Sequence, residues 1–246
     1  MNVPSLLFAN KTIAISGAAS GLGLAAASLL ANRGLKKLSL ADLDAEGLSK
    51  AAATITRAHP ECNVLTTVID VRRLGDTRNW MQRTMQRFQA LDGALNSAGV
   101  LRYSTLAETT SDEWNFVLGV NLTGTFNCMK AELEVLSDAG SIVNVASLAG
   151  LQGHPMTSAY TASKHGVVGI TKAVSQEVGD RKIRINALCP GIVDTPMTAR
   201  FPDIPQNLAI KRKATAEEIS YLISYLLSDE SMFVTGATMS IDGGFH

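Results

Sequence analysis

The sequence predicts an α/β fold, a doubly wound parallel sheet of seven strands flanked by helices. Short apolar segments alternate with longer segments whose apolar residues recur at helical spacing, as strands alternate with crossover helices. Several apolar segments lack a strict apolar–polar alternation, which is typical of strands covered on both faces. No linker, repeat or low-complexity segment interrupts the pattern, so residues 1–246 are expected to form a single domain.

Seven strands and six main helices follow from this pattern. The predicted strands are residues 12–16, 37–41, 63–69, 93–97, 141–146, 184–188 and 238–241. The first helix begins near Gly21 and ends at a glycine cap, Gly34. A long helix is expected from the capping residue Ser111 to about Leu136. The other helices are predicted at residues 45–58, 77–89, 158–178 and 216–227.

Composition and charge exclude several functional classes. Lys plus Arg equals Asp plus Glu at 22 each, so no basic excess indicates nucleic-acid binding. Cys62, Cys128 and Cys189 are odd in number and far apart, which favours neither disulfides nor zinc, and the four histidines lack metal-ligand spacing. The N-terminus shows no signal peptide, and no run of about 20 apolar residues indicates a membrane span. A cytoplasmic protein without bound metal is expected.

A glycine-rich turn connects the first strand to the first helix. Gly17, Gly21 and Gly23 permit a tight turn and a close approach of the backbone to a pyrophosphate. Ser20 and Leu22 lie in the same turn and are expected to contact the cofactor. The spacing G-x3-G-x-G differs from the usual G-x-G-x-x-G, so a turn that binds nothing is the alternative. The strand–turn–helix context favours a dinucleotide.

Asp42, at the end of the second strand, predicts NAD as the cofactor. A carboxylate there can accept hydrogen bonds from both ribose hydroxyls and would repel a 2′-phosphate. The alternative is an acidic residue that merely opens the next turn before the N-cap candidate Asp44. The carboxyl ends of two further strands are expected to line the same site, through Asp70, Val71, Asn96, Ala98 and Gly99.

Ser147, Tyr160 and Lys164 form the candidate chemical site. Tyr160 and Lys164 are four residues apart on a predicted helix and therefore share a face. A nearby ammonium favours the phenolate, which is the change that a general acid/base needs. Ser147 ends the fifth strand and could polarise a substrate oxygen. Asn121 falls on a buried stripe, where it either satisfies backbone groups at a helix irregularity or holds a water that leads protons to Lys164.

These motifs together resemble the short-chain dehydrogenase/reductase family, particularly fungal members of secondary metabolism. The resemblance covers nearly the whole chain and rests on Gly17, Gly21, Gly23, Asp70, the run 96–99, Asn121, Ser147, Tyr160, Lys164, Pro190, Gly191 and the run 242–244. It implies a single-domain Rossmann-type fold and NAD(P)-dependent interconversion of an alcohol and a ketone. Tyr160 would be the acid/base, Lys164 would bind the nicotinamide ribose, Ser147 would position the substrate and Asn121 would support a proton relay. The run 190–195 would bind nicotinamide, with Ile192 and Thr195 as the carboxamide and phosphate contacts.

The substrate and the assembly are predicted more coarsely. Apolar residues near the site favour a bulky, lipophilic alcohol or ketone of terpenoid, steroid or polyketide type; they are Val100, Leu101, Tyr103, Leu148, Ala149, Gly150, Leu151, Met156 and Met197. Residues 196–214 are short for a substrate lid. Phe126, Val167 and Ile170 give two helices a second apolar face, and the family commonly pairs these helices, so a homotetramer or homodimer is expected. An isomerase or dehydratase and a non-catalytic NAD sensor remain the alternatives.

Overall fold

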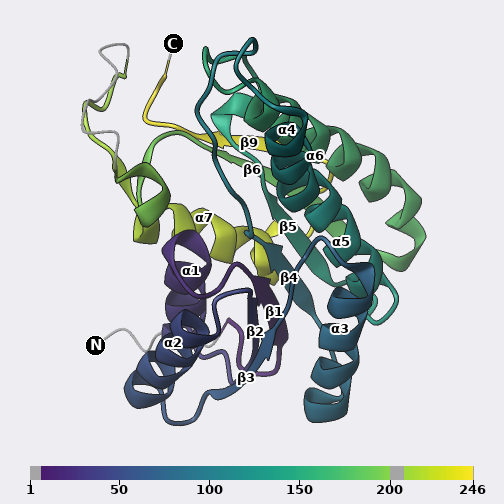
Figure 1. Ribbon diagram of the computed structural model, residues 1–246. Coiled ribbons are helices and arrows are strands. Elements are labelled where there is room, and N and C mark those ends of the chain that lie inside the picture. Colours follow the sequence, from purple (N-terminus) through teal and green to yellow (C-terminus); the bar gives the residue numbers. More distant parts are fainter. Residues whose placement is uncertain (1–6, 200–207, 246) are drawn as a thin grey trace.

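The sheet is parallel throughout and reverses its order at its centre (Figure 1). The computed structural model describes residues 7–199 and 208–245. The strand order β3-β2-β1-β4-β5-β6-β9 confirms the predicted α/β fold. The strands are β1 (Thr12–Ser16), β2 (Lys37–Asp42), β3 (Asn63–Val68), β4 (Gly93–Asn96), β5 (Ser141–Val145), β6 (Arg184–Pro190) and β9 (Thr238–Ile241). The chain winds outward from β1 through β2 to β3, then returns to β4 on the other side of β1 and winds outward in the opposite direction. This reversal leaves a crevice at the carboxyl ends of β1 and β4.

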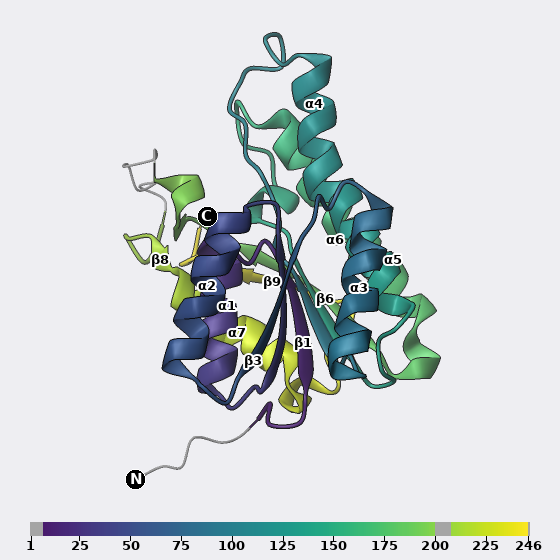
Figure 2. The same ribbon diagram turned by 60° about the horizontal axis from the view of Figure 1, so that its bottom comes forward.

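Helices cover both faces of the sheet (Figure 2). One layer contains α1 (Gly21–Asn32), α2 (Ala45–Ala58) and α7 (Ala216–Leu227). The other contains α3 (Leu74–Phe88), α5 (Gly124–Leu133) and α6 (Ser158–Glu177), while α4 (Ser111–Leu118) extends beyond the sheet. Each layer buries its own apolar cluster, with Leu30, Leu40 and Ile223 in the first and Trp80 and Ile142 in the second. Burial on both faces explains why the strands lack a polar face.

The long predicted helix is interrupted. A π-helical segment, Gly119–Thr123, separates α4 from α5. The N-cap is Thr110, whose hydroxyl accepts a hydrogen bond from the Glu113 amide, so the predicted cap Ser111 is wrong by one residue. The helix ends at Leu133 rather than Leu136, because the amides of Val135 and Leu136 both donate to the Glu132 carbonyl and so close a turn instead of continuing the helix.

Other differences concern element ends and small strands. Helix α3 begins at Leu74 instead of residue 77, and Asp76 in its first turn was the overlooked start signal. Most strands differ from their predicted bounds by a residue or two, and β6 extends to Pro190 because it pairs with Ile241 of β9. A short parallel pair, β7 (Val193–Asp194) with β8 (Ala214–Thr215), was not predicted because two-residue strands have no periodicity to detect.

The substrate segment predicted at 196–214 is only partly described. It opens with a 3-10 turn, Pro196–Thr198, and near its end Leu208 forms a bridge with Phe245. Residues 200–207 lie outside the described residues. In the parts that the structure does describe, no helix is long and apolar enough to cross a membrane. The same parts contain no group of three His, Cys, Asp or Glu residues that could hold a metal.

Candidate active site

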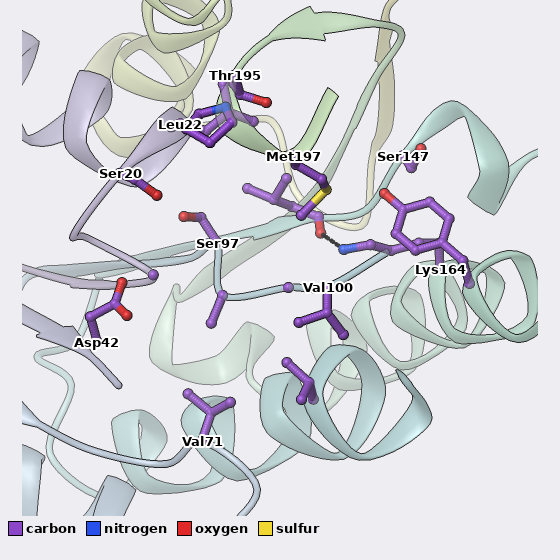
Figure 3. A pocket seen from close by; sticks show the side chains of 18 of the residues that line it. Ser20, Leu22, Asp42, Val71, Ser97, Val100, Ser147, Lys164, Thr195 and Met197 are labelled. Carbon is purple, nitrogen blue, oxygen red and sulfur yellow. Dashed lines mark hydrogen bonds between the residues drawn. The ribbon is translucent and has the colours of Figure 1, made fainter. Parts of the chain in front are cut away.

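A cavity of about 340 Å³ lies at the carboxyl edge of the sheet, above β1 and β4. Asp42 stands at one end of it, and Ser147 and Lys164 stand at the other (Figure 3). The predicted site residues that line it are Gly17, Ser20, Gly21, Leu22, Asp42, Asp70, Val71, Ala98, Gly99, Ser147, Tyr160, Lys164, Pro190, Gly191 and Thr195. A single cavity therefore brings together residues from the carboxyl ends of six strands, β1 to β6.

The glycine-rich turn is shaped by close backbone contacts. Gly17 has φ +68°, and a β-carbon on it would lie 2.6 Å from the Ala98 amide nitrogen. A β-carbon on Gly23 would lie 2.2 Å from the Gly17 carbonyl oxygen, so any other residue at position 23 would clash with the backbone of the turn. Ser20, the N-cap of α1, makes no side-chain capping bond. Its hydroxyl and the first amides of α1 are thus available to a phosphate.

Asp42 is held beside this turn. One carboxylate oxygen accepts a hydrogen bond from the Ala19 amide at 2.9 Å, and the other accepts one from the Asp44 amide at 3.0 Å. Each oxygen keeps acceptor capacity for a ligand hydroxyl. Asp44 itself caps α2 through the Gly47 amide, as its position suggested. The Asp42 carboxylate is therefore fixed in place with spare acceptors facing the same cavity as the turn.

Lys164 and Tyr160 share the opposite end. The Lys164 ammonium donates to the Val145 carbonyl at 2.7 Å and lies 5.6 Å from the centre of the Tyr160 ring. Burial lowers the pKa of Lys164 to about 8. Burial raises the pKa of Tyr160, and a hydrogen bond with Ser147 opposes that rise. The expected lowering of the Tyr160 pKa by Lys164 is not seen: the loss of solvent around the phenol is the largest cause of the shift, and Ser147 is the group that opposes it.

Comparison with known proteins places this geometry in a family. The family model described as enoyl-(acyl carrier protein) reductase matches residues 17–246. The short-chain dehydrogenase/reductase aba4 of Botryotinia fuckeliana is 43% identical over 97% of this chain and 98% of its own length. The chain belongs to the short-chain dehydrogenase/reductase family.

Other relatives are bacterial dehydrogenases and reductases. Levodione reductase of Leifsonia aquatica is 37% identical over 98% of this chain and 96% of its own length. A crystal structure of levodione reductase superposes with a TM-score of 0.90 at 35% identity, covering 96% of this chain and 98% of that chain. Trans-4-hydroxycyclohexanecarboxylate dehydrogenase of Sinomonas cyclohexanicum is 37% identical, over 96% of this chain and 93% of its own. The protein is thus an oxidoreductase whose family uses NAD(P) and small-molecule substrates.

Asn121 lies behind the cavity in this short-chain dehydrogenase/reductase. It is fully buried in the π-helical segment. Its amide nitrogen donates to the Val100 carbonyl and the Ser163 hydroxyl, both at 3.0 Å, and its oxygen accepts from the Val100 amide at 2.8 Å. Asn121 therefore does satisfy backbone groups, but they belong to Val100 in the segment after β4 and not to the helix irregularity in which Asn121 lies. These bonds also fix the backbone beside Gly99. A β-carbon on Gly99 would lie 3.3 Å from the Asn121 oxygen and 3.6 Å from the Lys164 nitrogen, so Gly99 lies between these two side chains.

Three predicted cofactor contacts do not line the cavity, namely Gly23, Asn96 and Ile192. Asn96 points into the core, where its amide nitrogen donates to Glu132 and to Asn144 at 3.0 Å each. At the last position of β4, strand alternation points its side chain towards α5, the helix that carries Glu132. Gly23 acts through its missing side chain, as described above.

The predicted apolar substrate wall is also smaller than expected. Of the nine residues named for it, Val100 and Met197 line the cavity. Leu148, Ala149 and Gly150 are buried in a 3-10 turn. The other four do not line the cavity, and three of them, Tyr103, Leu151 and Met156, are 42–46% exposed.

Several lining residues were not predicted from the sequence. They are Leu43, Ile69, Arg72, Phe116, Val120, Val145, Ala146, Pro196 and Thr198. Phe116 and Val120 stand four residues apart on the helix that carries Asn121, so helical spacing could have found them. Arg72 directly follows the predicted Asp70–Val71 contact, and the charge next to that contact was the overlooked signal.

Proposed function

We propose that this protein is an NAD-dependent dehydrogenase or ketoreductase that interconverts a secondary alcohol and its ketone. The observation that carries the proposal is one cavity with Asp42 at one end and Ser147 and Lys164 at the other, where the Tyr160 ring lies 5.6 Å from the Lys164 ammonium. The Gly17–Gly23 turn and Ser20 would hold the pyrophosphate of the dinucleotide. Asp42 would accept the adenosine ribose hydroxyls and exclude a 2′-phosphate.

The chemical step depends on proton transfer at the Tyr160 hydroxyl. When bound, the dinucleotide supplies the hydride acceptor for oxidation and the hydride donor for reduction. Tyr160 takes the alcohol proton during oxidation and returns it to the ketone oxygen during reduction. The Ser147 hydroxyl donates a hydrogen bond that holds the substrate oxygen. The Lys164 ammonium, anchored on the Val145 carbonyl, would favour the phenolate against the opposing effect of burial and would bind the nicotinamide ribose.

The proposed substrate is a bulky, mostly apolar alicyclic alcohol or ketone. Val100 and Met197 give the cavity apolar walls close to the reacting end. The names of two relatives, levodione reductase and trans-4-hydroxycyclohexanecarboxylate dehydrogenase, indicate a diketone and a ring alcohol as substrates of those proteins. A ring of that kind presents one oxygen to Ser147 and Tyr160 and an apolar body to the walls.

Absorbance at 340 nm tests the proposal. Purified protein is mixed with NAD or NADP and a panel of alicyclic, terpenoid and steroid alcohols, and with small polar alcohols as the comparison. Net NADH formation with the alicyclic or larger alcohols supports the proposal. Product without net NADH would indicate an isomerase, NADH binding without turnover would indicate a sensor, and a preference for NADP would refute the role of Asp42.

A further inference from the structure

A cluster of charged and aromatic side chains closes one side of the cofactor cavity. Arg72, in the loop between β3 and α3, pairs with Asp70, and its guanidinium lies 5.5 Å from the centre of the Phe116 ring. Arg102 approaches the same ring at 5.1 Å from the segment that follows β4. The cluster thus joins three chain segments that are far apart in the sequence, and Asp70, Arg72 and Phe116 all line the cavity.

Arg72 is fixed at both ends of its side chain. Its Nε donates to the two Asp70 oxygens at 2.9 and 3.0 Å, and its Nη2 donates to one of them at 2.6 Å. Its methylene groups lie against Gly119, where an added β-carbon would be 3.6 Å from Cδ. Exposed ion pairs with one contact contribute little to stability. This pair is bidentate and its carboxylate is only 11% exposed, so it holds both side chains in a defined geometry.

The Asp70 carboxylate is held in one orientation by these bonds. The Arg72 backbone amide also donates to it, at 3.0 Å. The Arg72 side chain is the main reason that the pKa of Asp70 lies below its ordinary value. A carboxylate has about four lone-pair positions. The three donor hydrogens of Arg72 reach them through four bonds, because the Nε hydrogen is shared between both oxygens, so a ligand donor has to replace only one half of that shared bond. Asp70 is therefore charged and oriented, and it can accept one ligand donor while it keeps all three Arg72 donors.

The location of the cluster selects the adenine half of the cofactor. The amide of Ile69, next to Asp70, donates to the backbone carbonyl of Asp42 at 3.0 Å, so the two loops are neighbours. Val71 lies on the Asp42 side of the cavity and away from Ser147 (Figure 3). A donor that reaches Asp70 from a dinucleotide bound through Asp42 is thus the exocyclic amine of the adenine, not the nicotinamide or the substrate.

We propose that Arg72 is a positioning residue for adenine: it holds the Asp70 carboxylate for the adenine amine and, with Phe116, forms the side wall against the ring. This inference rests on the proposed function, because it assumes that the cavity binds a dinucleotide. It assigns to Arg72 an effect on cofactor affinity without an effect on the chemical step.

Two truncated ligands test the inference in solution. AMP carries the adenine half alone, and reduced nicotinamide mononucleotide carries the other half. NADH affinity is measured by fluorescence titration, and the fragments are measured by displacement of NADH or by calorimetry. In Arg72→Gln, NADH and AMP affinities fall about tenfold while affinity for reduced nicotinamide mononucleotide stays within about twofold. Arg72→Lys gives an intermediate loss, because lysine keeps the charge without the bidentate geometry.

Arg73→Gln is the matched control. Arg73 adds only a through-space charge to Asp70, so its removal tests charge without contact and leaves AMP affinity unchanged. Thermal melting of each variant checks the fold. Equal AMP affinity in the wild type and Arg72→Gln overturns the inference, and so does an equal loss for both fragments, which indicates a general structural effect. If the wild type binds neither NADH nor AMP, the proposed function itself fails.

Discussion

At the residue scale, cofactor choice depends on the Asp42 carboxylate. Replacing Asp42 by Ala removes the acceptor for the ribose hydroxyls and the repulsion of a 2′-phosphate. We expect kcat/KM with NAD to fall by about tenfold, which corresponds to a loss of about 1.4 kcal/mol of transition-state stabilisation. We also expect the preference for NAD over NADP to disappear. Glu46→Gln is the control, because Glu46 is an exposed carboxylate nearby that pairs only with Lys50. An unchanged NAD preference in Asp42→Ala would show that another group selects the cofactor.

A second residue-scale prediction concerns Glu132, a fully buried acid behind the turn that follows β4. One of its oxygens accepts from Asn96, and the other has no partner among the described residues. Burial raises the pKa of Glu132 from 4.5 to about 8. As pH rises, the unfolded chain therefore loses this proton before the folded protein does. The free energy of unfolding falls between about pH 4.5 and pH 8 and no longer changes through this group above that range.

Glu132→Gln removes this pH dependence, because the amide has nearly the same shape and stays neutral. Urea unfolding at pH 5, 7 and 8.5 is the measurement. The free energy of unfolding of the variant should rise relative to that of the wild type as pH increases, by on the order of a few kcal/mol at pH 8.5. Glu177→Gln, at an exposed position on α6, should follow the wild type at every pH. A constant difference between Glu132→Gln and the wild type would mean that Glu132 is not held neutral by the fold.

At the element scale, the start of α1 requires Gly23. An alanine there would place its β-carbon 2.2 Å from the Gly17 carbonyl oxygen, so the turn must open. We expect Gly23→Ala to lose about 1–3 kcal/mol of stability and most of its NADH affinity. Gly169→Ala is the matched control, since nothing lies within 4 Å of an added β-carbon on that exposed position of α6. That variant should gain about 0.5–1 kcal/mol in urea unfolding. Full NADH binding by Gly23→Ala would contradict the proposed phosphate site.

The elements also show what the sequence could predict. The strands could be predicted because burial on both faces leaves continuous apolar runs. The glycine-rich turn could be predicted because its glycines lie between a predicted strand and a predicted helix. The π-helical segment was not found: four of its five residues, Gly119, Val120, Asn121 and Thr123, are weak helix formers, but such a composition does not distinguish i→i+5 bonding from an ordinary helical turn. Asn121 alone signalled it, as an amide on a buried stripe.

The site was predictable where side-chain type decides chemistry and less so where direction decides it. The shared location of Tyr160, Lys164 and Ser147 in one cavity could be predicted, because helical spacing puts the first two on one face and Ser147 follows a strand. Asn96 turned into the core because strand alternation, not residue type, sets which side it faces. Arg72 and Phe116 reach the cavity through tertiary contacts between loops that the sequence places far apart.

At the scale of the whole molecule, we predict a homotetramer. Val167 and Ile170 pack inside the chain, so they no longer support an exposed second face. Phe126 on α5 is 47% exposed, and Met232 and Phe233, ahead of β9, are 75% and 104% exposed. Two separate apolar surfaces are what a tetramer with two different two-fold interfaces needs. Light scattering at micromolar concentration should give four chains, and Phe233→Asp should give a smaller assembly. A monomeric wild type would contradict the prediction.

The measurement that most directly tests the account is hydride transfer in Tyr160→Phe. Phenylalanine keeps the ring and removes the ionisable hydroxyl. Absorbance at 340 nm follows turnover of an alcohol accepted by the wild type, and fluorescence titration follows NADH binding in the same samples. The account predicts a loss of about 10²–10⁴-fold in kcat with NADH affinity nearly unchanged. Turnover close to that of the wild type would contradict it, because the proton would then have to leave through another group.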